Sequence, residues 1–232
     1  DAAAAIVVNA PAALARQVAA AHPVEAAFPR TGSIARAALK AARPYQWVKN
    51  LLCLVPLVAA GALGDLAGWR GALLLMVGFC LVASSIYVLN DLSDLSADRR
   101  HARKRRRPIA AGTLPIIHAL ALAAALFVAG AAFAAASGAF LYVLLYAAAS
   151  VAYSMRLKEQ PLVDVFMLAF LYTIRLFGGG VASGHEVSLW LLGFSSFLFL
   201  SLALVKRVSE LGRQSASAPG TLLARRGYSA ED

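Results

Sequence analysis

The sequence predicts an all-α fold, a polytopic bundle of transmembrane helices, and three observations support this prediction. Hydrophobic residues make up 60% of the 232 residues, whereas soluble domains are nearer half apolar. Apolar runs of membrane-span length, about 17 to 25 residues, recur along the chain. Most charged residues lie between these runs. Together these features indicate about six transmembrane spans.

Six apolar segments are the expected spans, and Gly-containing turns or polar loops separate them. They cover about residues 47–63, 70–89, 114–136, 139–154, 162–182 and 187–205. With six spans, 20 of the 22 Lys and Arg residues fall on one side of the membrane. Because basic residues are retained in the cytoplasm, we expect an integral protein of the inner cell membrane whose polar loops face the cytoplasm.

The net charge of +10 has two possible meanings. A basic chain can bind nucleic acid, but in a membrane protein basic residues first report topology. We therefore expect the lipid bilayer, and no nucleic acid, among the partners.

Residues 1–32 differ in character from the rest of the chain. Ala4–Ala10 is typical of a short buried strand, and Pro11–Ala21 of a helix that begins at a proline. They resemble the last strand and helix of a haloacid-dehalogenase-like phosphatase domain, without its nucleophilic Asp motif. We expect residues 1–32 to be the tail of a preceding soluble domain, with a linker as the alternative. The membrane domain is expected at 33–232, where a basic amphipathic segment, Ser33–Lys49, would lie on a membrane face.

Acidic residues follow directly after the second expected span. The stretch Asn90–Gly112 reads NDLSDLSADRRHARKRRRPIAAG. If the helix continues at about 100° per residue, one face carries an amide and three carboxylates. These residues are Asn90, Asp91, Asp94 and Asp98. Such a face repels itself unless a cation joins it, and oxygen ligands suit Mg²⁺ completed by substrate phosphates. We expect these four residues to be Mg²⁺ ligands and the three Asp residues to be catalytic.

A basic run comes next, with seven Lys and Arg residues within 99–107. Guanidinium and ammonium groups bind phosphate oxygens. The two runs together predict a diphosphate site at the membrane surface. A solvated loop whose charges only set topology is the alternative, and it explains the basic run but not three Asp residues in register.

The pattern NDxxDxxxD followed by RRPIAAG resembles the UbiA-type superfamily of intramembrane prenyltransferases. RPYQWVKN at 43–50 resembles the entry to the first helix in the branch that includes decaprenyl-phosphate phosphoribosyltransferase. YSMRLKEQPLVD at 153–164, and KRVSEL at 206–211 with RRGY at 225–228, resemble the loops after the fourth and sixth helices. The resemblance covers about residues 34–232.

The resemblance implies nine transmembrane helices around a central cavity, of which the sequence predicts six here. It implies Mg²⁺ as the cofactor, and a diphosphate donor and a polyprenyl lipid as partners. Several basic residues would lie near the phosphates or offer further cationic contacts. They are Arg103, Lys104, Arg107, Lys158, Lys206 and Arg207.

Several single residues are further candidates. Arg175 lies inside an expected span, where a charge usually faces a cavity or a partner. Asp164 lies about three helical turns earlier, so both can line the cavity, with a structural pair between helices as the alternative. We also expect Asp164 and Lys158 to be catalytic. Lys49 and Asn50 either bind the acceptor or anchor the first span at the interface. Tyr153 is likewise a cavity group or an interfacial anchor.

The function that these features favour is Mg²⁺-dependent group transfer from a diphosphate donor to or from a polyprenyl lipid. The resemblance at 43–50 favours phosphoribosyl transfer to a polyprenyl phosphate, and prenyl transfer to an aromatic or other small acceptor is the close alternative. Two other classes are a cation transporter and an inactive scaffold. A transporter would hold its acidic residues within the membrane, whereas these adjoin an arginine-rich run.

Overall fold

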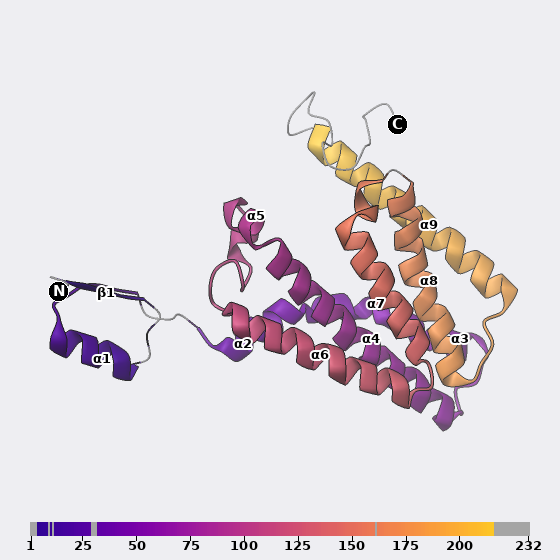
Figure 1. The fold of residues 1–232 in the computed structure, drawn as a ribbon. Coiled ribbons are helices and arrows are strands. Elements are labelled where there is room, and N and C mark those ends of the chain that lie inside the picture. Colours follow the sequence, from indigo (N-terminus) through magenta and orange to yellow (C-terminus); the bar gives the residue numbers. More distant parts are fainter. Residues whose placement is uncertain (1–3, 9, 11, 29–31, 161, 216–232) are drawn as a thin grey trace.

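The computed structural model describes residues 4–8, 10, 12–28, 32–160 and 162–215, and it contains a helical bundle with a small α/β unit to one side (Figure 1). The small unit consists of β1 (Ala5–Val8), α1 (Ala12–Ala21) and β2 (Val24–Phe28). The two strands pair in parallel, with Ile6 opposite Ala26. The expected strand and helix are therefore present, and the second strand is an addition. The assignment of residues 1–32 to a preceding domain stays a prediction.

The rest of the described chain is mainly helical. After α2 (Ile34–Ala42) the chain continues through the 3₁₀ helix η1 (Pro44–Leu54), α3 (Val55–Ala59), α4 (Leu66–Ser93), α5 (Leu95–Arg100) and the 3₁₀ turn η2 (Lys104–Arg106). Then come α6 (Ile116–Ala136), α7 (Phe140–Met155), the 3₁₀ turn η3 (Leu157–Glu159), α8 (Val163–Ser183) and α9 (Leu189–Ser215). The four helices α4, α6, α8 and α9 are long and apolar enough to cross a membrane, and α7 is a shorter apolar helix. The predicted all-α membrane bundle is confirmed.

The prediction that residues 47–63 form one continuous membrane-spanning helix is wrong. Residues 47–63 instead form the end of η1, the short α3 and a turn. Pro56 gives the physical reason, because proline has no backbone N–H and its ring clashes with the carbonyl four residues earlier in an α-helix. Pro56 lies in the first turn of α3, where helices tolerate proline.

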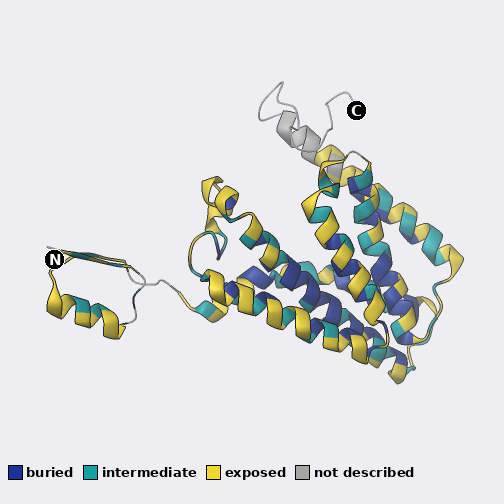
Figure 2. Ribbon diagram, in the orientation of Figure 1, coloured by how far each residue is buried: buried dark blue, intermediate teal, exposed yellow. Residues whose placement is uncertain are grey.

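Helix α4 forms the centre of the bundle, with α6 beside it (Figure 1). Buried side chains line α4 and the faces of its neighbours, whereas the outer faces are exposed (Figure 2). Leu75, Phe79 and Val82 pack with Val143 of α7 and Ile174 of α8. The exposed outer faces carry many large apolar side chains, as expected for helices that contact lipid.

Glycines allow the closest approaches between these elements. A Cβ atom at Gly179 of α8 would overlap the backbone of Cys53 in η1. A Cβ atom at Gly71 of α4 would overlap the backbone of Ala182. The Gly-Gly-Gly run at 178–180 therefore serves close packing, as small residues do between membrane helices.

Candidate active site

The polar end of α4 does not continue as one helix. Helix α4 ends at Ser93, Asp94 leaves the helical conformation, and α5 starts at Leu95. Ser93 donates a hydrogen bond from Oγ to the carbonyl of Leu89, at 3.0 Å, and such back-bonding weakens and bends helix ends. The expectation that all four predicted ligands share one helical face is therefore wrong.

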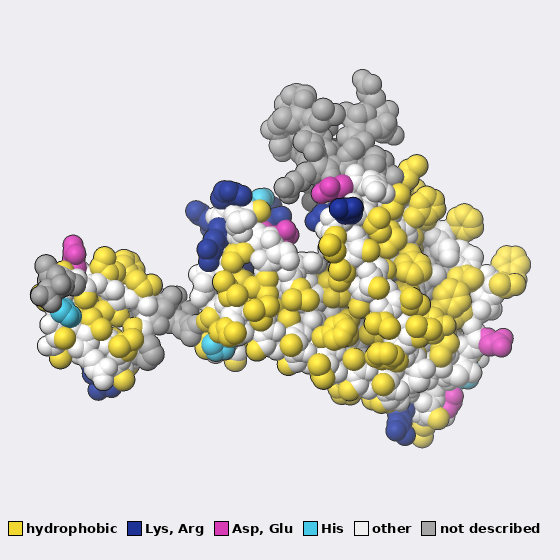
Figure 3. Space-filling view, viewed as in Figure 1, with side chains coloured by type: hydrophobic (Ala, Val, Ile, Leu, Met, Phe, Trp, Pro, Cys, Tyr) yellow, Lys and Arg dark blue, Asp and Glu magenta, His cyan; other side chains and the backbone are white. Residues whose placement is uncertain are grey.

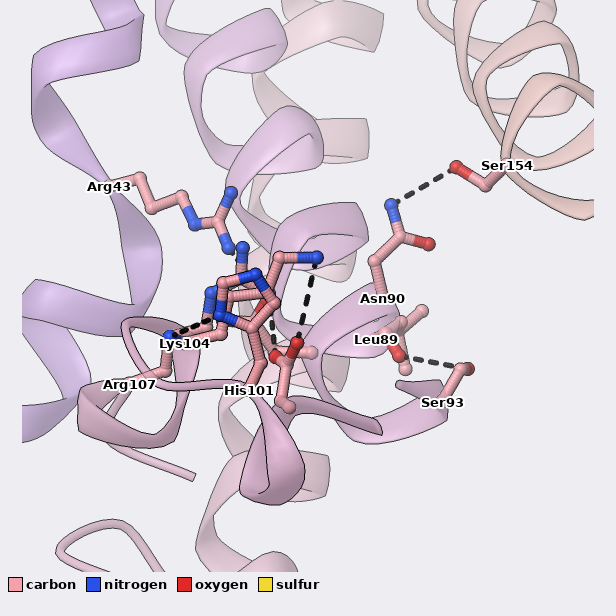
Figure 4. Close-up of polar contacts among 10 residues, drawn as sticks. Arg43, Leu89, Asn90, Ser93, His101, Lys104, Arg107 and Ser154 are labelled. Carbon is pink, nitrogen blue, oxygen red and sulfur yellow. Dashed lines mark hydrogen bonds and ion pairs between the residues drawn. The ribbon is translucent and has the colours of Figure 1, made fainter. Parts of the chain in front are cut away.

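Two of the Asp residues meet around arginines. Arg107 Nη1 lies 3.0 Å from Asp91 Oδ1 and 2.6 Å from Asp98 Oδ2, and Arg43 Nη2 lies 2.6 Å from Asp91 Oδ1. The side chains of Asp91 and Asp98 are only 4% and 2% exposed. Both buried carboxylates are thus paired, as buried charges must be, and Arg107 joins α4, α5 and the loop that follows (Figure 4).

Asn90 points away from this arginine cluster. Its Nδ2 donates a hydrogen bond to Ser154 Oγ of α7 at 3.1 Å (Figure 4). Asp94 is exposed, and its backbone N–H donates to the Asn90 carbonyl at 2.9 Å, which places the two residues one turn apart. The side chains of Asn90 and Asp91 therefore point to opposite sides of the end of α4, Asn90 toward α7 and Asp91 toward the arginines.

The oxygen donors are chemically suited to Mg²⁺. Asp98 Oδ1 is buried and accepts no hydrogen bond from a described residue, with Lys104 Nζ 3.9 Å away. Within the described ranges, no group of three or more His, Cys, Asp or Glu side chains is arranged to hold a metal. Mg²⁺ commonly needs only one or two carboxylates, with substrate phosphates and water completing the shell. The residues present thus fit this ion, and the metal assignment stays a prediction.

A cavity of about 280 Å³ lies beside Asn90, between η1, α4, α7, α8 and α9. We call it the central cavity. The sequence-predicted residues that line it are Lys49, Asn90, Tyr153, Arg175 and Lys206. Three of these carry a positive charge, so the cavity suits an anionic ligand. The Ser150 hydroxyl, which also lines it, is buried and has no hydrogen-bond partner among the residues described.

Arg175 is the buried cation of this cavity, at 4% exposure. Its Nε donates a hydrogen bond to Asn50 Oδ1 at 2.7 Å, and its Nη1 donates to the carbonyl of Leu171. Its guanidinium carbon lies 4.5 Å from the ring centre of Tyr146 and 5.8 Å from that of Tyr172. An amide and aromatic faces therefore hold this charge in place.

The other predicted residues divide into groups. Asp164 is fully buried in the first turn of α8 and does not line the central cavity. Lys158 is half-buried in η3, and Lys104 is half-exposed beside Asp98. Arg103 and Arg107 line a second pocket, described below. The side chain of Arg207 lies outside the described residues, as does the RRGY motif at 225–228.

Sequence reasoning missed several cavity residues and one contact. Tyr87, Tyr146 and Tyr172 line the cavity, although each lies within an apolar span. A tyrosine in the middle of a span carries a polar hydroxyl that lipid cannot satisfy, and this signal could have marked Tyr146 and Tyr172. Tyr87 lies near the end of its expected span, where tyrosine is common, so this signal does not mark it. The pairing of Asn50 with Arg175 joins residues 125 positions apart, which no local pattern reveals.

The fold and the cavity define a helical membrane protein with a polar, cationic site at one end. Residues 51–215 match the UbiA prenyltransferase family, and the chain belongs to that family. The decaprenyl-phosphate phosphoribosyltransferase of Corynebacterium glutamicum is 39% identical over 77% of this chain and 56% of its own length. The enzyme of that name from Mycolicibacterium smegmatis is 39% identical over 82% of this chain and 63% of its own.

Nodulation protein NoeC of Azorhizobium caulinodans is also similar, at 37% identity over 83% of this chain and 63% of that protein. The chain thus spans less than two thirds of the length of these relatives. A UbiA homologue from Archaeoglobus fulgidus has been solved with Mg²⁺ and DMAPP, and in another structure with Mg²⁺ and GPP. The match to the DMAPP structure covers 75% of this chain and 64% of the solved chain, with a TM-score of 0.63 and 24% sequence identity. At this identity the match shows the shared fold.

Proposed function

We propose that this protein is an Mg²⁺-dependent intramembrane transferase that moves a group from a diphosphate donor to a polyprenyl lipid. One observation carries the proposal: Lys49, Arg175 and Lys206 line a single cavity that Asn90 also lines. Cations from η1, α8 and α9 would bind the diphosphate, while the oxygen-rich end of α4 supplies ligands for a metal. The naming of similar proteins as transferases supports the same reaction class.

The residues at the end of α4 have separate roles in this proposal. Asn90 and Asp94, one turn apart, are the proposed Mg²⁺ ligands on the cavity side. Asp98 stays a predicted ligand through its Oδ1, although its Oδ2 is paired with Arg107 on the Asp91 side. Asp91, predicted as a fourth ligand, is already neutralised by two arginines, and we assign it to hold them. When bound, Mg²⁺ would neutralise the leaving pyrophosphate.

The chain's own groups would do the remaining work. Lys49 and Lys206 would hold donor phosphate oxygens, and Arg175 would fix the donor's orientation from the cavity wall. The apolar flanks of the bundle let a polyprenyl chain lie in the bilayer while its head group enters the cavity.

Phosphoribosyl transfer to a polyprenyl phosphate is the particular reaction that we propose. The cationic lining suits a soluble donor that carries more phosphate than a prenyl diphosphate does. The similarity to two phosphoribosyltransferases, each 39% identical, supports this choice. The site would face the cytoplasm at the inner membrane, where such a soluble donor is found, in line with the basic residues at this end of the bundle.

The test supplies labelled donors separately to membranes that contain the protein in its full-length form, with Mg²⁺ and a lipid extract. Label from phosphoribosyl diphosphate should enter the lipid phase, and an Asp94→Asn variant should transfer less label at a limiting Mg²⁺ concentration. Transfer from prenyl diphosphate alone, to a non-phosphorylated acceptor, would replace the phosphoribosyl proposal by prenyl transfer. Transfer from neither donor would overturn the proposed function.

A further inference from the structure

A second pocket, of about 280 Å³, lies on the Asp91 side of α4. Asp91 lines this pocket, whereas the preceding residue, Asn90, lines the central cavity. The end of α4 therefore separates the two spaces. The second pocket is lined by Lys40, Arg43, Tyr45, Asp91, Arg103, Arg106, Arg107 and Pro108, and we call it the basic pocket.

The charges in the basic pocket do not balance. Five cationic side chains line it against one carboxylate, that of Asp91. Arg43 and Arg107 are paired with Asp91 and Asp98. Lys40, Arg103 and Arg106 make no ion pair within the part of the chain that the structure describes. Three surplus positive charges thus converge on one concave space from α2 and from the loop after α5.

The backbone beside this pocket makes an unusual turn at Arg43. Arg43 adopts φ 53° and ψ 58°, a left-handed conformation that non-glycine residues rarely hold. This turn ends α2, starts η1 and places the Arg43 guanidinium 2.6 Å from Asp91. Lys and Arg side chains gather over the same end of the bundle, around α5 (Figure 3). This turn lies where Lys40 of α2 and the arginines of the basic loop line one pocket.

From this surplus charge and geometry we propose a second phosphate-binding site in the basic pocket, separate from the central cavity. Lys40, Arg103 and Arg106 would bind the phosphate oxygens, and Tyr45, which is 69% exposed, would donate from its hydroxyl. The phosphate is that of a lipid head group or of a soluble phosphate ester. Leu39, next to Lys40, and Val48, three residues after Tyr45, are exposed apolar side chains that suit the lipid source.

The test compares two sets of three substitutions that remove the same charge. Lys40→Gln, Arg103→Gln and Arg106→Gln empty the pocket of its surplus cations. Arg36→Gln, Arg99→Gln and Arg100→Gln are the control, since these exposed residues of α2 and α5 do not line the pocket. A charge-conserving set, Lys40→Arg, Arg103→Lys and Arg106→Lys, should retain binding, which shows that any loss in the pocket set follows the removed charge. The melting temperature of each set in detergent shows whether it is folded.

Two arms separate the sources of phosphate. In the first, pyrophosphate without metal is titrated into the protein in uncharged detergent. In the second, native mass spectrometry counts phosphatidic acid bound to the protein in phosphatidylcholine bilayers. In at least one arm the pocket set should weaken binding by about tenfold or more, the loss expected for one charge-assisted hydrogen bond, while the control set changes it little.

Each outcome decides the proposal. A pocket-specific loss in the first arm assigns a soluble phosphate, and a loss in the second assigns a lipid head group. Equal effects of the pocket and control sets in both arms, or no effect of either, would overturn the proposal and leave only a general positive surface. Because the readout is binding and not transfer, these outcomes are independent of the proposed function.

Discussion

At the scale of single residues, neighbouring side chains at the end of α4 have different contacts. Asn90 contacts α7 and the central cavity, Asp91 pairs with arginines, and Asp94 is exposed. A sequence pattern treats these residues as one motif, whereas the break after Ser93 separates them in space. The consequences differ for each residue and can be tested one at a time.

Asp94→Asn keeps the size of the side chain and removes its charge. If Asp94 binds the metal, the Mg²⁺ concentration for half-maximal transfer should rise by at least about 10- to 100-fold, the loss typical when even an outer partner of a metal ligand is removed. The measurement is transfer rate against Mg²⁺ concentration. Asp65→Asn is the control, because Asp65 caps the opposite end of α4. An unchanged Mg²⁺ dependence in Asp94→Asn would refute the assignment.

Arg175→Gln removes the buried cation of the central cavity. The loss of charge-assisted hydrogen bonds should raise the KM for the diphosphate donor by about 10- to 100-fold. Melting temperature is measured beside the kinetics, because Arg175 also holds Asn50. A large fall in melting temperature with an unchanged KM would show that the residue acts in packing only.

Much of the site was predictable at this scale. Lys49, Asn90, Tyr153, Arg175 and Lys206 were all predicted from the sequence, and the structure brings them to one cavity. A charge inside an apolar span marks Arg175, polar residues at span ends mark Lys49, Asn90 and Tyr153, and the family resemblance marks Lys206. What could not be predicted is which groups face one another, since the contact of Asn50 with Arg175 depends on packing between distant segments.

At the scale of elements, five of the six expected spans correspond to apolar helices, and the first does not. Hydropathy reports that a segment is apolar, but it does not report whether its backbone can stay helical. Pro56 interrupts that segment, and η1 passes so close to α8 that only glycine fits at position 179. The approach of η1 to α8 also brings Asn50 to Arg175.

Gly179→Ala tests this close approach. The added methyl group would overlap the backbone of Cys53, so we expect a destabilisation of about 1 to 3 kcal/mol, the usual cost of overpacking. Gly193→Ala in α9 is the matched control, because a Cβ atom there meets no atom within 4 Å. Thermal unfolding in detergent measures both variants. Equal melting temperatures for the two would contradict the packing role of Gly179.

At the scale of the whole molecule, the two ends of the bundle differ in charge. Lys and Arg side chains crowd the end that holds α5, and hydrophobic side chains cover the flanks (Figure 3). Helix α4 runs between the turn that precedes Leu66 and this basic end. The positive end is therefore expected in the cytoplasm.

Cysteine labelling tests this orientation in intact cells. The background lacks Cys53 and Cys80, which are both buried. A membrane-impermeant maleimide should label Leu63→Cys, in the exposed turn before α4, and should label Arg105→Cys only after the cells are permeabilised. Labelling of position 105 from outside would reverse the topology.

At the end of α4, Arg43 and Arg107 are the counterions of Asp91 and Asp98. A ligand that changed this pairing would also change the affinity of the carboxylates for cations. A phosphate bound by Lys40, Arg103 and Arg106 would lie beside these two paired guanidinium groups. If it drew one of them away, the released carboxylate would gain affinity for a cation. Phosphate and Mg²⁺ should therefore strengthen each other's binding by the same factor, because linkage is reciprocal. Sulfate, a weak ligand of Mg²⁺ in water, should lower the Mg²⁺ concentration needed for half-saturation. Arg43→Gln should reduce that response, and an equal response in this variant would show that the counterions are not exchanged.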